Sequence, residues 1–99
     1  MAGTKCIEFA ESALLDLEEI RAWYFEQGVA AIGERLVGEI VSLVEQLTDY
    51  PESGRIVPEF GLPAVRELIY PPFRIVYRVG ATQLWIVRVW RSERLLKIP

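Results

Sequence analysis

The stretch Phe73-Arg74-Ile75-Val76-Tyr77-Arg78-Val79 decides the fold, because it has the pattern of a central β-strand. Alternate residues of a strand point to opposite faces, so the aromatic and aliphatic residues at the odd positions share one face, which is predicted to join the core. The opposite face carries Arg74, Val76 and Arg78. A face with two guanidinium groups is either solvated or used to hold an anion, a carboxylate or a partner chain.

Two further strand candidates flank this stretch, at residues 65–70 and 84–90. The connections, Pro71-Pro72 and residues 80–83, are short enough to join antiparallel neighbours, so a three-stranded meander is the simplest topology. The last strand is almost continuously apolar, which predicts burial on both faces and an internal place in the sheet. A short strand at residues 5–9 is expected to pair at one edge.

Two helices are predicted between the first strand and the meander. Ser12 is a candidate N-cap of the first, with the acids Asp16, Glu18 and Glu19 placed where the helix dipole favours them or just beyond. An apolar stripe runs along this helix to Gly28, which is predicted to end it in a left-handed conformation, and residues 29–47 repeat the apolar pattern. The stripe of the first helix comprises Leu14, Leu17, Ile20 and Tyr24, and at least two residues of the set Trp23, Tyr24 and Phe25 are expected in the core.

The second helix contains two glycines, Gly33 and Gly38, which either allow close helix contact or are simply tolerated. Residues 49–63 are rich in proline and glycine and are predicted to form a long loop, fixed to the body by apolar side chains. The predicted fold is therefore a single α+β domain over residues 1–99. In it, an N-terminal strand and an antiparallel helix hairpin pack on an antiparallel sheet of about four strands.

Charge is distributed unequally along the chain. Residues 1–50 hold three bases and ten acids, a net charge of −7, whereas residues 51–99 hold eight bases and four acids, a net charge of +4. This asymmetry has two interpretations. The C-terminal half contacts an anionic partner, or its arginines pair with acids of the first half.

Several kinds of site are disfavoured by composition. The chain has no histidine and one cysteine, so it has neither an internal disulfide nor a usual set of zinc ligands, and no metal or cofactor is expected. Cys6 is predicted to be buried as a small hydrophobe. The start of the chain lacks the pattern of a signal peptide, and no apolar run approaches the roughly 20 residues of a membrane-spanning helix, so a cytoplasmic location is expected.

The order of these elements resembles that of the RelE/ParE toxin superfamily of bacterial toxin–antitoxin modules. The resemblance covers nearly the whole chain and is most specific in the central strand, where an aromatic residue, Arg, an aliphatic pair, Tyr and Arg follow one another. It is carried by three strings: Val65-Arg66-Glu67-Leu68, the central strand itself, and Val87-Arg88-Val89-Trp90-Arg91. The resemblance implies a small toxin that is held inactive by the C-terminal segment of an antitoxin.

Two activities occur within this superfamily, and the fold does not choose between them. RelE-like members cleave mRNA on the ribosome, for which Arg74, Arg91 and Arg94 are the candidate catalytic residues here. Such cleavage needs a base and an acid as well as phosphate stabilisation. This chain has Arg91 where many members have a histidine, and no tyrosine follows it. An enzyme is therefore the less favoured hypothesis.

ParE-like members inhibit DNA gyrase by protein binding, which requires no catalytic groups, and this is the favoured hypothesis. A third hypothesis is an inactive toxin-fold protein that survives as a binding partner. The residues expected to bind antitoxin or target are Arg66, Arg74, Arg78, Arg88, Arg91, Arg94 and Lys97. Some arginines could instead pair with Glu67, Glu59 or the acidic hairpin, and Arg74→Ala is expected to weaken partner binding with the fold intact.

Overall fold

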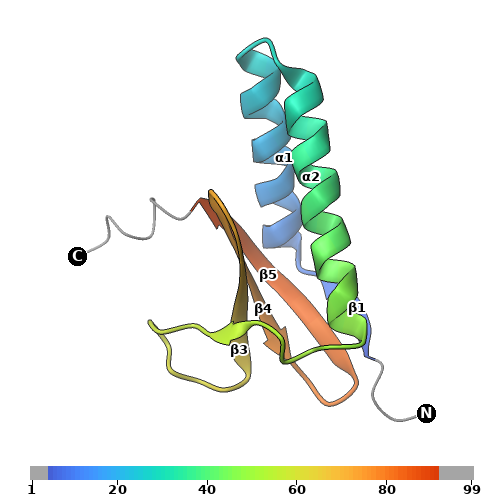
Figure 1. Cartoon of the computed structure of the whole chain (residues 1–99), viewed down its shortest axis with the longest axis vertical. Helices are drawn as coiled ribbons and strands as arrows, with labels where there is room; N and C mark the ends of the chain where they lie inside the picture. The colour runs from blue at the N-terminus through green and yellow to red at the C-terminus, as the bar shows by residue number, and fades with distance from the viewer. Residues whose placement is uncertain (1–4, 92–99) are drawn as a thin grey trace.

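A helix hairpin packs against one face of a five-stranded sheet in the computed structural model, which describes residues 5–91 (Figure 1). The predicted α+β class is confirmed. The elements follow in the order β1 (Cys6–Phe9), α1 (Glu11–Glu26), α2 (Ala30–Glu45), a 3₁₀ turn (Gln46–Thr48), β2 (Arg55–Ile56), β3 (Val65–Tyr70), β4 (Phe73–Val79) and β5 (Gln83–Arg91). None of the helices in this range combines the length and the apolar character needed to cross a lipid bilayer.

The sheet differs from the prediction in two details. Its strand order is β1-β5-β4-β3-β2, and β1 runs parallel to β5, so the sheet is mixed rather than wholly antiparallel. The fifth strand, β2, lies inside the predicted loop and pairs with β3 through only two residues. The predicted meander of β3, β4 and β5 is confirmed, as is the edge position of β1.

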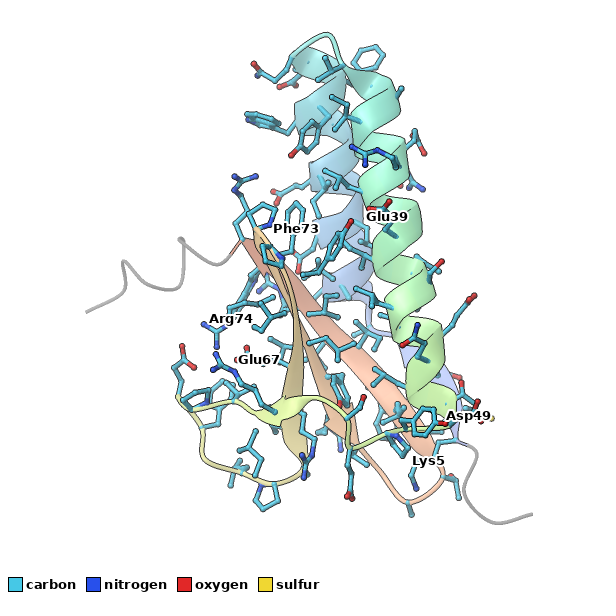
Figure 2. The ribbon with its side chains drawn as sticks, in the orientation of Figure 1. Lys5, Glu39, Asp49, Glu67, Phe73 and Arg74 are labelled. Carbon is cyan, nitrogen blue, oxygen red and sulfur yellow. The ribbon has the colours of Figure 1, made fainter. Side chains whose placement is uncertain are left out.

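Strand β4 is the middle strand and supplies the centre of the core. It pairs along its length with β3 and β5, and Phe73, Ile75 and Tyr77 are buried on the face that the hairpin covers. Figure 2 shows Phe73 on the hairpin side of the sheet and Arg74 on the opposite side. The other core residues come from both helices, the 3₁₀ turn and β5: Ala13, Leu17, Ile20, Val37, Ile40, Val44, Leu47, Leu84, Ile86 and Val89.

A β-bulge interrupts the pairing of β4 with β5. Val76 lies opposite Arg88 and Tyr77 lies opposite Ile86, so Val87 has no residue opposite it. The bulge reverses the alternation, which is why Ile86 and Val89, three residues apart, both reach the core. The prediction that β5 is buried on both faces is wrong, because the helices cover only one face and residues such as Trp85 and Trp90 remain partly exposed on the other (Figure 1).

Helix α1 completes the edge of β5 beyond the point where β1 ends. The N–H of Ala10 donates to the carbonyl of Ile86 at 2.9 Å, and the hydroxyl of Ser12 donates to the carbonyl of Val87 at 2.6 Å. One turn later, a carboxylate oxygen of Asp16 accepts the N–H of Val89 at 2.8 Å. The prediction of Ser12 as N-cap is wrong, because its hydroxyl is used on β5 and Ala10 occupies the N-cap position without a side-chain bond.

The end of the hairpin extends past the sheet, and this exposes side chains predicted to be buried (Figure 1). Trp23 is 51% exposed and Phe25 is 72% exposed, so of the three consecutive aromatic residues only Tyr24 packs against the core. Leu14, predicted in the core stripe, is also exposed, because α1 turns Ala13 and Asp16 towards the sheet. Helical periodicity marks an apolar face but does not show how far the opposing layer extends.

Cys6 is exposed, so the prediction of a buried thiol is wrong. Strand β1 lies at the edge of the sheet, and Cys6 pairs with Gln83 near the end of β5. Its neighbour Ile7 lies opposite the buried Leu84 and packs against the core. Because alternate residues of a strand point to opposite faces, the thiol is directed to the face that the helices leave uncovered.

The two glycines of α2 have different roles, and this gives a matched prediction. A Cβ on Gly33 would lie 2.9 Å from the Cβ of Tyr24 on α1, whereas a Cβ on Gly38 would meet no atom within 4 Å. We expect Gly38→Ala to raise the free energy of unfolding by about 0.5–1 kcal/mol through helix propensity. Gly33→Ala should lower it by about 1–3 kcal/mol through overpacking. Urea denaturation of both variants checks this, and equal signs for the two changes would contradict close packing at Gly33.

Candidate functional site

Three of the four arginines at even positions in the meander share the face of the sheet that lacks helices, here called the helix-free face. Arg74 and Arg78 alternate with Phe73, Ile75 and Tyr77, the residues that β4 contributes to the core. The register places Arg88 on the same side as these two arginines, opposite Val76. Arg66 lies opposite Tyr77 and is therefore on the hairpin side. The register, which the sequence left open, thus separates Arg66 from the other three.

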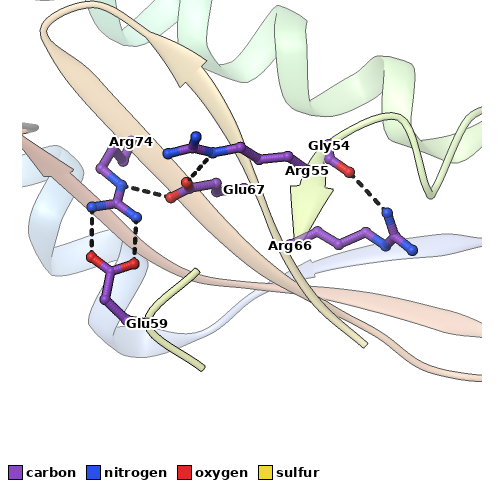
Figure 3. A network of polar contacts seen from close by, with 6 residues as sticks. All are labelled: Gly54, Arg55, Glu59, Arg66, Glu67 and Arg74. Atoms are coloured by element: carbon purple, nitrogen blue, oxygen red, sulfur yellow. Dashed lines mark hydrogen bonds and ion pairs between the residues drawn. The ribbon is translucent and has the colours of Figure 1, made fainter. Parts of the chain in front are cut away.

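Arg74 is the buried centre of an ion-pair network on the helix-free face (Figure 3). Its Nε donates to Glu67 Oε1 at 2.6 Å, and its two terminal nitrogens donate to the two carboxylate oxygens of Glu59, each at 3.0 Å. Arg55 donates to the second oxygen of Glu67 at 2.6 Å. The side chains of Arg74 and Glu67 are 7% and 0% exposed. Two carboxylates from β3 and the loop therefore enclose this guanidinium.

The hydrogen bonds of this network shift the protonation equilibria of its members. The carboxylate of Glu59, with a smaller contribution from Glu67, raises the pKa of the Arg74 guanidinium against the opposing effect of burial. The hydrogen bonds from Arg74 lower the pKa of the Glu59 carboxyl below its usual value. Both shifts favour the charged forms, so the pair stays ionised at neutral pH.

Arg88 and Arg78 are held by different contacts. Arg88 donates twice to the carboxylate of Asp16 on α1, at 2.7 and 2.9 Å, and these bonds raise the pKa of its guanidinium. Its guanidinium carbon also lies 4.6 Å from the centre of the Trp90 ring. Arg78 stacks on Trp85 at 4.3 Å and forms no ion pair with a residue in the described range. Arg78 is thus an exposed cation presented on an aromatic platform.

The remaining candidates have different positions. Arg66 donates to the carbonyls of Pro63 and Gly54, each at 3.0 Å, and so holds the two ends of the loop together. The guanidinium of Arg91 lies 5.7 Å from the ring of Phe73. Arg94 and Lys97 lie outside the described residues. The structure therefore brings Arg74, Arg78 and Arg88 to one face and leaves Arg66 apart from them.

A cleft of about 560 Å³ opens between α1 and the ends of β4 and β5. Trp23, Phe73 and Trp90 give it aromatic walls, and Glu19 and Arg91 lie on its lining. Trp23 is therefore exposed because it faces this cleft and not a packed layer. A cleft with aromatic walls and charged groups at its border has the character of a protein-binding pocket.

Comparisons with known proteins identify the family. Residues 7–96 match the family model described as the ParE toxin of the type II toxin–antitoxin system parDE. The chain belongs to the ParE toxin family. No curated protein matches this toxin in sequence.

Two solved structures have the same fold as this toxin. One, from the chromosomal ParDE toxin–antitoxin system of P. aeruginosa, is 26% identical with a TM-score of 0.75, and the match covers 89% of this chain and 96% of that one. The other, from the toxin–antitoxin complex RelBE2 of Mycobacterium tuberculosis, is 18% identical with a TM-score of 0.66, and the match covers 89% and 98% of the two chains. The resemblance to the RelE/ParE superfamily is therefore confirmed.

The interpretation that some arginines pair within the toxin is confirmed for Arg74 and Arg88. Whether any arginine also contacts an antitoxin or a target stays a prediction. Within residues 5–91, no three Cys, Asp or Glu residues are grouped so as to hold a metal ion. The carboxylates beside Arg74 are both engaged by guanidinium groups, so the network has the chemistry of ion pairing and not of proton transfer.

Four members of the site are missed by sequence reasoning. Arg55 falls within the predicted long loop, Asp16 is explained by the helix dipole alone, and Trp85 and Trp90 lie in a strand predicted to be buried on both faces. The only available signal was Glu67, a single acid within an apolar strand, which needs a cationic partner if it is buried. A pairing of Arg55 with Glu67 across two strands depends on register and could not be read from spacing alone.

The Glu59 contact predicts a defined pH dependence. Because the pKa of Glu59 is lowered in the folded toxin from its ordinary value of 4.5, its contribution to stability is present above pH 4.5 and is lost as the pH falls through the folded pKa. Glu59 is half exposed, so this contribution should be below about 1 kcal/mol. Denaturation of wild type and Glu59→Gln should show a difference at neutral pH that disappears in acid. A difference that grows in acid would contradict the assigned pair.

Proposed function

We propose that this toxin inhibits DNA gyrase by protein binding and is neutralised by a cognate antitoxin. The observation that carries the proposal is the state of Arg74, the arginine that the family resemblance assigns to phosphate chemistry. Its guanidinium is 7% exposed, and both of its terminal nitrogens are bonded to Glu59. An arginine enclosed in this way supports protein recognition over RNA cleavage.

Cleavage of RNA would require three functions at one place: a base, a cation on the phosphate and a proton donor for the leaving oxygen. Glu59 is a weak base because its pKa is lowered, and Glu67 is buried between two guanidinium groups. Tyr77 is fully buried, its hydroxyl bonded to Pro51 and Gly54, and desolvation raises its pKa. These groups support the non-enzymatic hypothesis, with cleavage of ribosome-bound mRNA as the alternative outcome of the test.

The antitoxin is proposed to contact both the helix-free face and the cleft. Its carboxylates would meet the stacked Arg78 and Arg88, and its apolar side chains would enter between Trp23 and Trp90. The two similar solved structures belong to toxin–antitoxin systems, which supports a hetero-oligomer here. The proposed binding residues are Arg66, Arg74, Arg78, Arg88, Arg91, Arg94 and Lys97. We place the toxin in the cytoplasm, where gyrase and ribosomes both occur.

The gyrase hypothesis is tested with purified toxin in a supercoiling and DNA-cleavage assay, run beside translating ribosomes probed for mRNA cuts. We expect inhibition of gyrase with no codon-dependent cuts. Cuts without gyrase inhibition would replace this proposal with the ribonuclease. Normal growth of cells that express folded toxin without an antitoxin would instead support the inactive toxin-fold protein.

Arg78 and Arg35 form a matched pair for testing the antitoxin surface. Both are exposed arginines, but Arg78 lies on the helix-free face and Arg35 lies on α2, 3.9 Å from Glu39. We expect Arg78→Ala to weaken antitoxin binding by about tenfold, corresponding to about 1.4 kcal/mol for one lost charged contact. Arg35→Ala should leave binding unchanged. Titration calorimetry with the cognate antitoxin measures both, and equal losses would place the antitoxin elsewhere.

A further inference from the structure

We propose that the two terminal nitrogens of the Arg74 guanidinium form a carboxylate-binding site. Glu59 occupies this site in the free toxin, and a carboxylate of the antitoxin replaces it in the complex. This inference rests on the proposed neutralisation by an antitoxin. It assigns Glu59 the role of an internal ligand that covers the site until the partner arrives. Four observations carry it: the geometry of the two carboxylates, the charge balance, the attachment of the loop, and the apolar neighbours of Arg74.

The two carboxylates that bind Arg74 differ in burial and in their number of guanidinium partners. Figure 3 shows Glu67 bonded to the Nε side of the guanidinium and Glu59 bonded end-on to its two terminal nitrogens. Glu67 is 0% exposed and is also held by Arg55, whereas Glu59 is 51% exposed. Glu67 is therefore a fixed, buried member of the network. Glu59 lies between Arg74 and solvent, in the position that an external ligand would take.

The charges of the network require an anion at this position. Without Glu59, the remaining cluster of Arg55, Arg74 and Glu67 carries one net positive charge, and the two terminal nitrogens of a buried guanidinium lose their acceptors. Parallel N–H groups of a guanidinium match the two oxygens of a carboxylate, as Glu59 itself demonstrates with two bonds of 3.0 Å. A carboxylate from another chain can replace that of Glu59 bond for bond.

The loop is attached so that Glu59 can leave without opening the core. Val57 is buried and its N–H donates to the carbonyl of Val65, which fixes the loop two residues before Glu59. Phe60 and Leu62, on the other side of Glu59, are both exposed. Displacement of Glu59 therefore breaks its two bonds to Arg74 and leaves the buried anchor in place. Because Glu59 is tethered nearby, a ligand must compete with a high local concentration of carboxylate.

The surroundings of Arg74 indicate what kind of ligand can win this competition. The register places Ile69 of β3 and Trp90 of β5 directly opposite Arg74 on its two sides. Ile69 is exposed and Trp90 is partly exposed. A protein segment that combines an acidic side chain with apolar neighbours would gain contacts with both, which Glu59 alone does not make. A phosphate backbone would gain no apolar contact and would approach a protein of net charge −3.

The test uses the folded full-length toxin and two probes, acetate as the carboxylate and a short single-stranded RNA as the phosphate. Binding is followed by NMR on the Nε–H resonance of Arg74 in wild type, Glu59→Gln and the matched control Glu52→Gln. Glu52 belongs to the same loop, and its substitution changes the net charge equally. We expect Glu59→Gln to bind acetate at least tenfold more tightly than wild type, with no gain for RNA and no change in Glu52→Gln.

Two results would overturn the inference. Equal acetate binding by wild type and Glu59→Gln would show that Glu59 does not cover the site, and tighter RNA binding by Glu59→Gln would make it a phosphate site. The double variant Glu59→Gln/Arg74→Lys keeps the charge but lacks the paired terminal nitrogens, so the gain for acetate should be lost. Because this variant has no Nε–H, its binding is followed on the indole N–H resonance of Trp90, which lies opposite position 74 on β5 and is recorded in every variant. Circular dichroism confirms that each variant is folded. Since no readout involves gyrase, failure of the gyrase proposal would leave this result intact.

Discussion

Arg74→Ala should lower the free energy of unfolding by about 3–5 kcal/mol, the effect of removing one partner from a buried ion pair. The substitution leaves Glu67 fully buried, with the exposed Arg55 as its only guanidinium partner within residues 5–91. A domain of this size has a total stability of about 5–15 kcal/mol, so the loss should be visible as a large shift in the urea midpoint. This replaces the sequence-based expectation that the variant keeps its fold intact.

The control for this prediction removes the buried charges together. In Arg74→Met/Glu67→Met neither charge remains, and replacement of a buried pair by apolar residues of similar volume is often neutral. We therefore expect the double variant to recover most of the stability that Arg74→Ala loses. Glu59→Ala, which removes only the exposed partner, should cost less than about 1 kcal/mol. A double variant no more stable than Arg74→Ala would contradict the assigned role of the pair.

Asp16→Ala is the second change with a large expected effect, a loss of about 3 kcal/mol in the free energy of unfolding. The carboxylate is buried and joins α1 to β5 by accepting the N–H of Val89 and two bonds from Arg88. Its removal leaves a buried backbone donor without an acceptor. Asp16→Asn keeps one acceptor and should lose less.

Glu18→Ala provides the comparison for Asp16, because both acids occupy the first half of α1. Glu18 is exposed, and among the described residues its ion-pair partner is the exposed Arg21 and not a residue of the sheet. Its removal should change the free energy of unfolding by less than about 0.5 kcal/mol. Thermal or urea denaturation of both variants checks the difference. Equal losses would indicate that the helix dipole, and not the contact with β5, determines the contribution of Asp16.

These two acids illustrate what the sequence could and could not predict. Periodicity correctly gave the helix hairpin, the meander and the central position of Phe73 to Val79, because each of these depends on residues close together in the chain. It treated Asp16, Glu18 and Glu19 as equivalent, because helix position alone does not distinguish them. Their difference arises from contacts with β5, more than 70 residues away.

The candidate site was predicted in composition but not in arrangement. The arginines of β4 and β5 were identified, and their pairing with Glu59, Glu67 or the acidic hairpin was one of two open interpretations. Strand register, the bulge at Val87 and the place of β2 decide which residues share the helix-free face, and none of these leaves a local signal. The exposed Trp23 and Cys6 were misplaced for a related reason, since the extent of a layer is a property of the whole fold.

The contacts of β5 with β1 and α1 make completion of the sheet depend on the synthesis of β5. Ser12 and Val87, which bond to each other, are 75 residues apart, and within residues 5–91 β1 pairs with no strand other than β5. Contacts between such distant segments form slowly and require both to be present. A nascent chain that has not reached β5 therefore has neither the neighbour of β1 nor the acceptor of Ser12. The complete sheet is assembled only after β5 has left the ribosome.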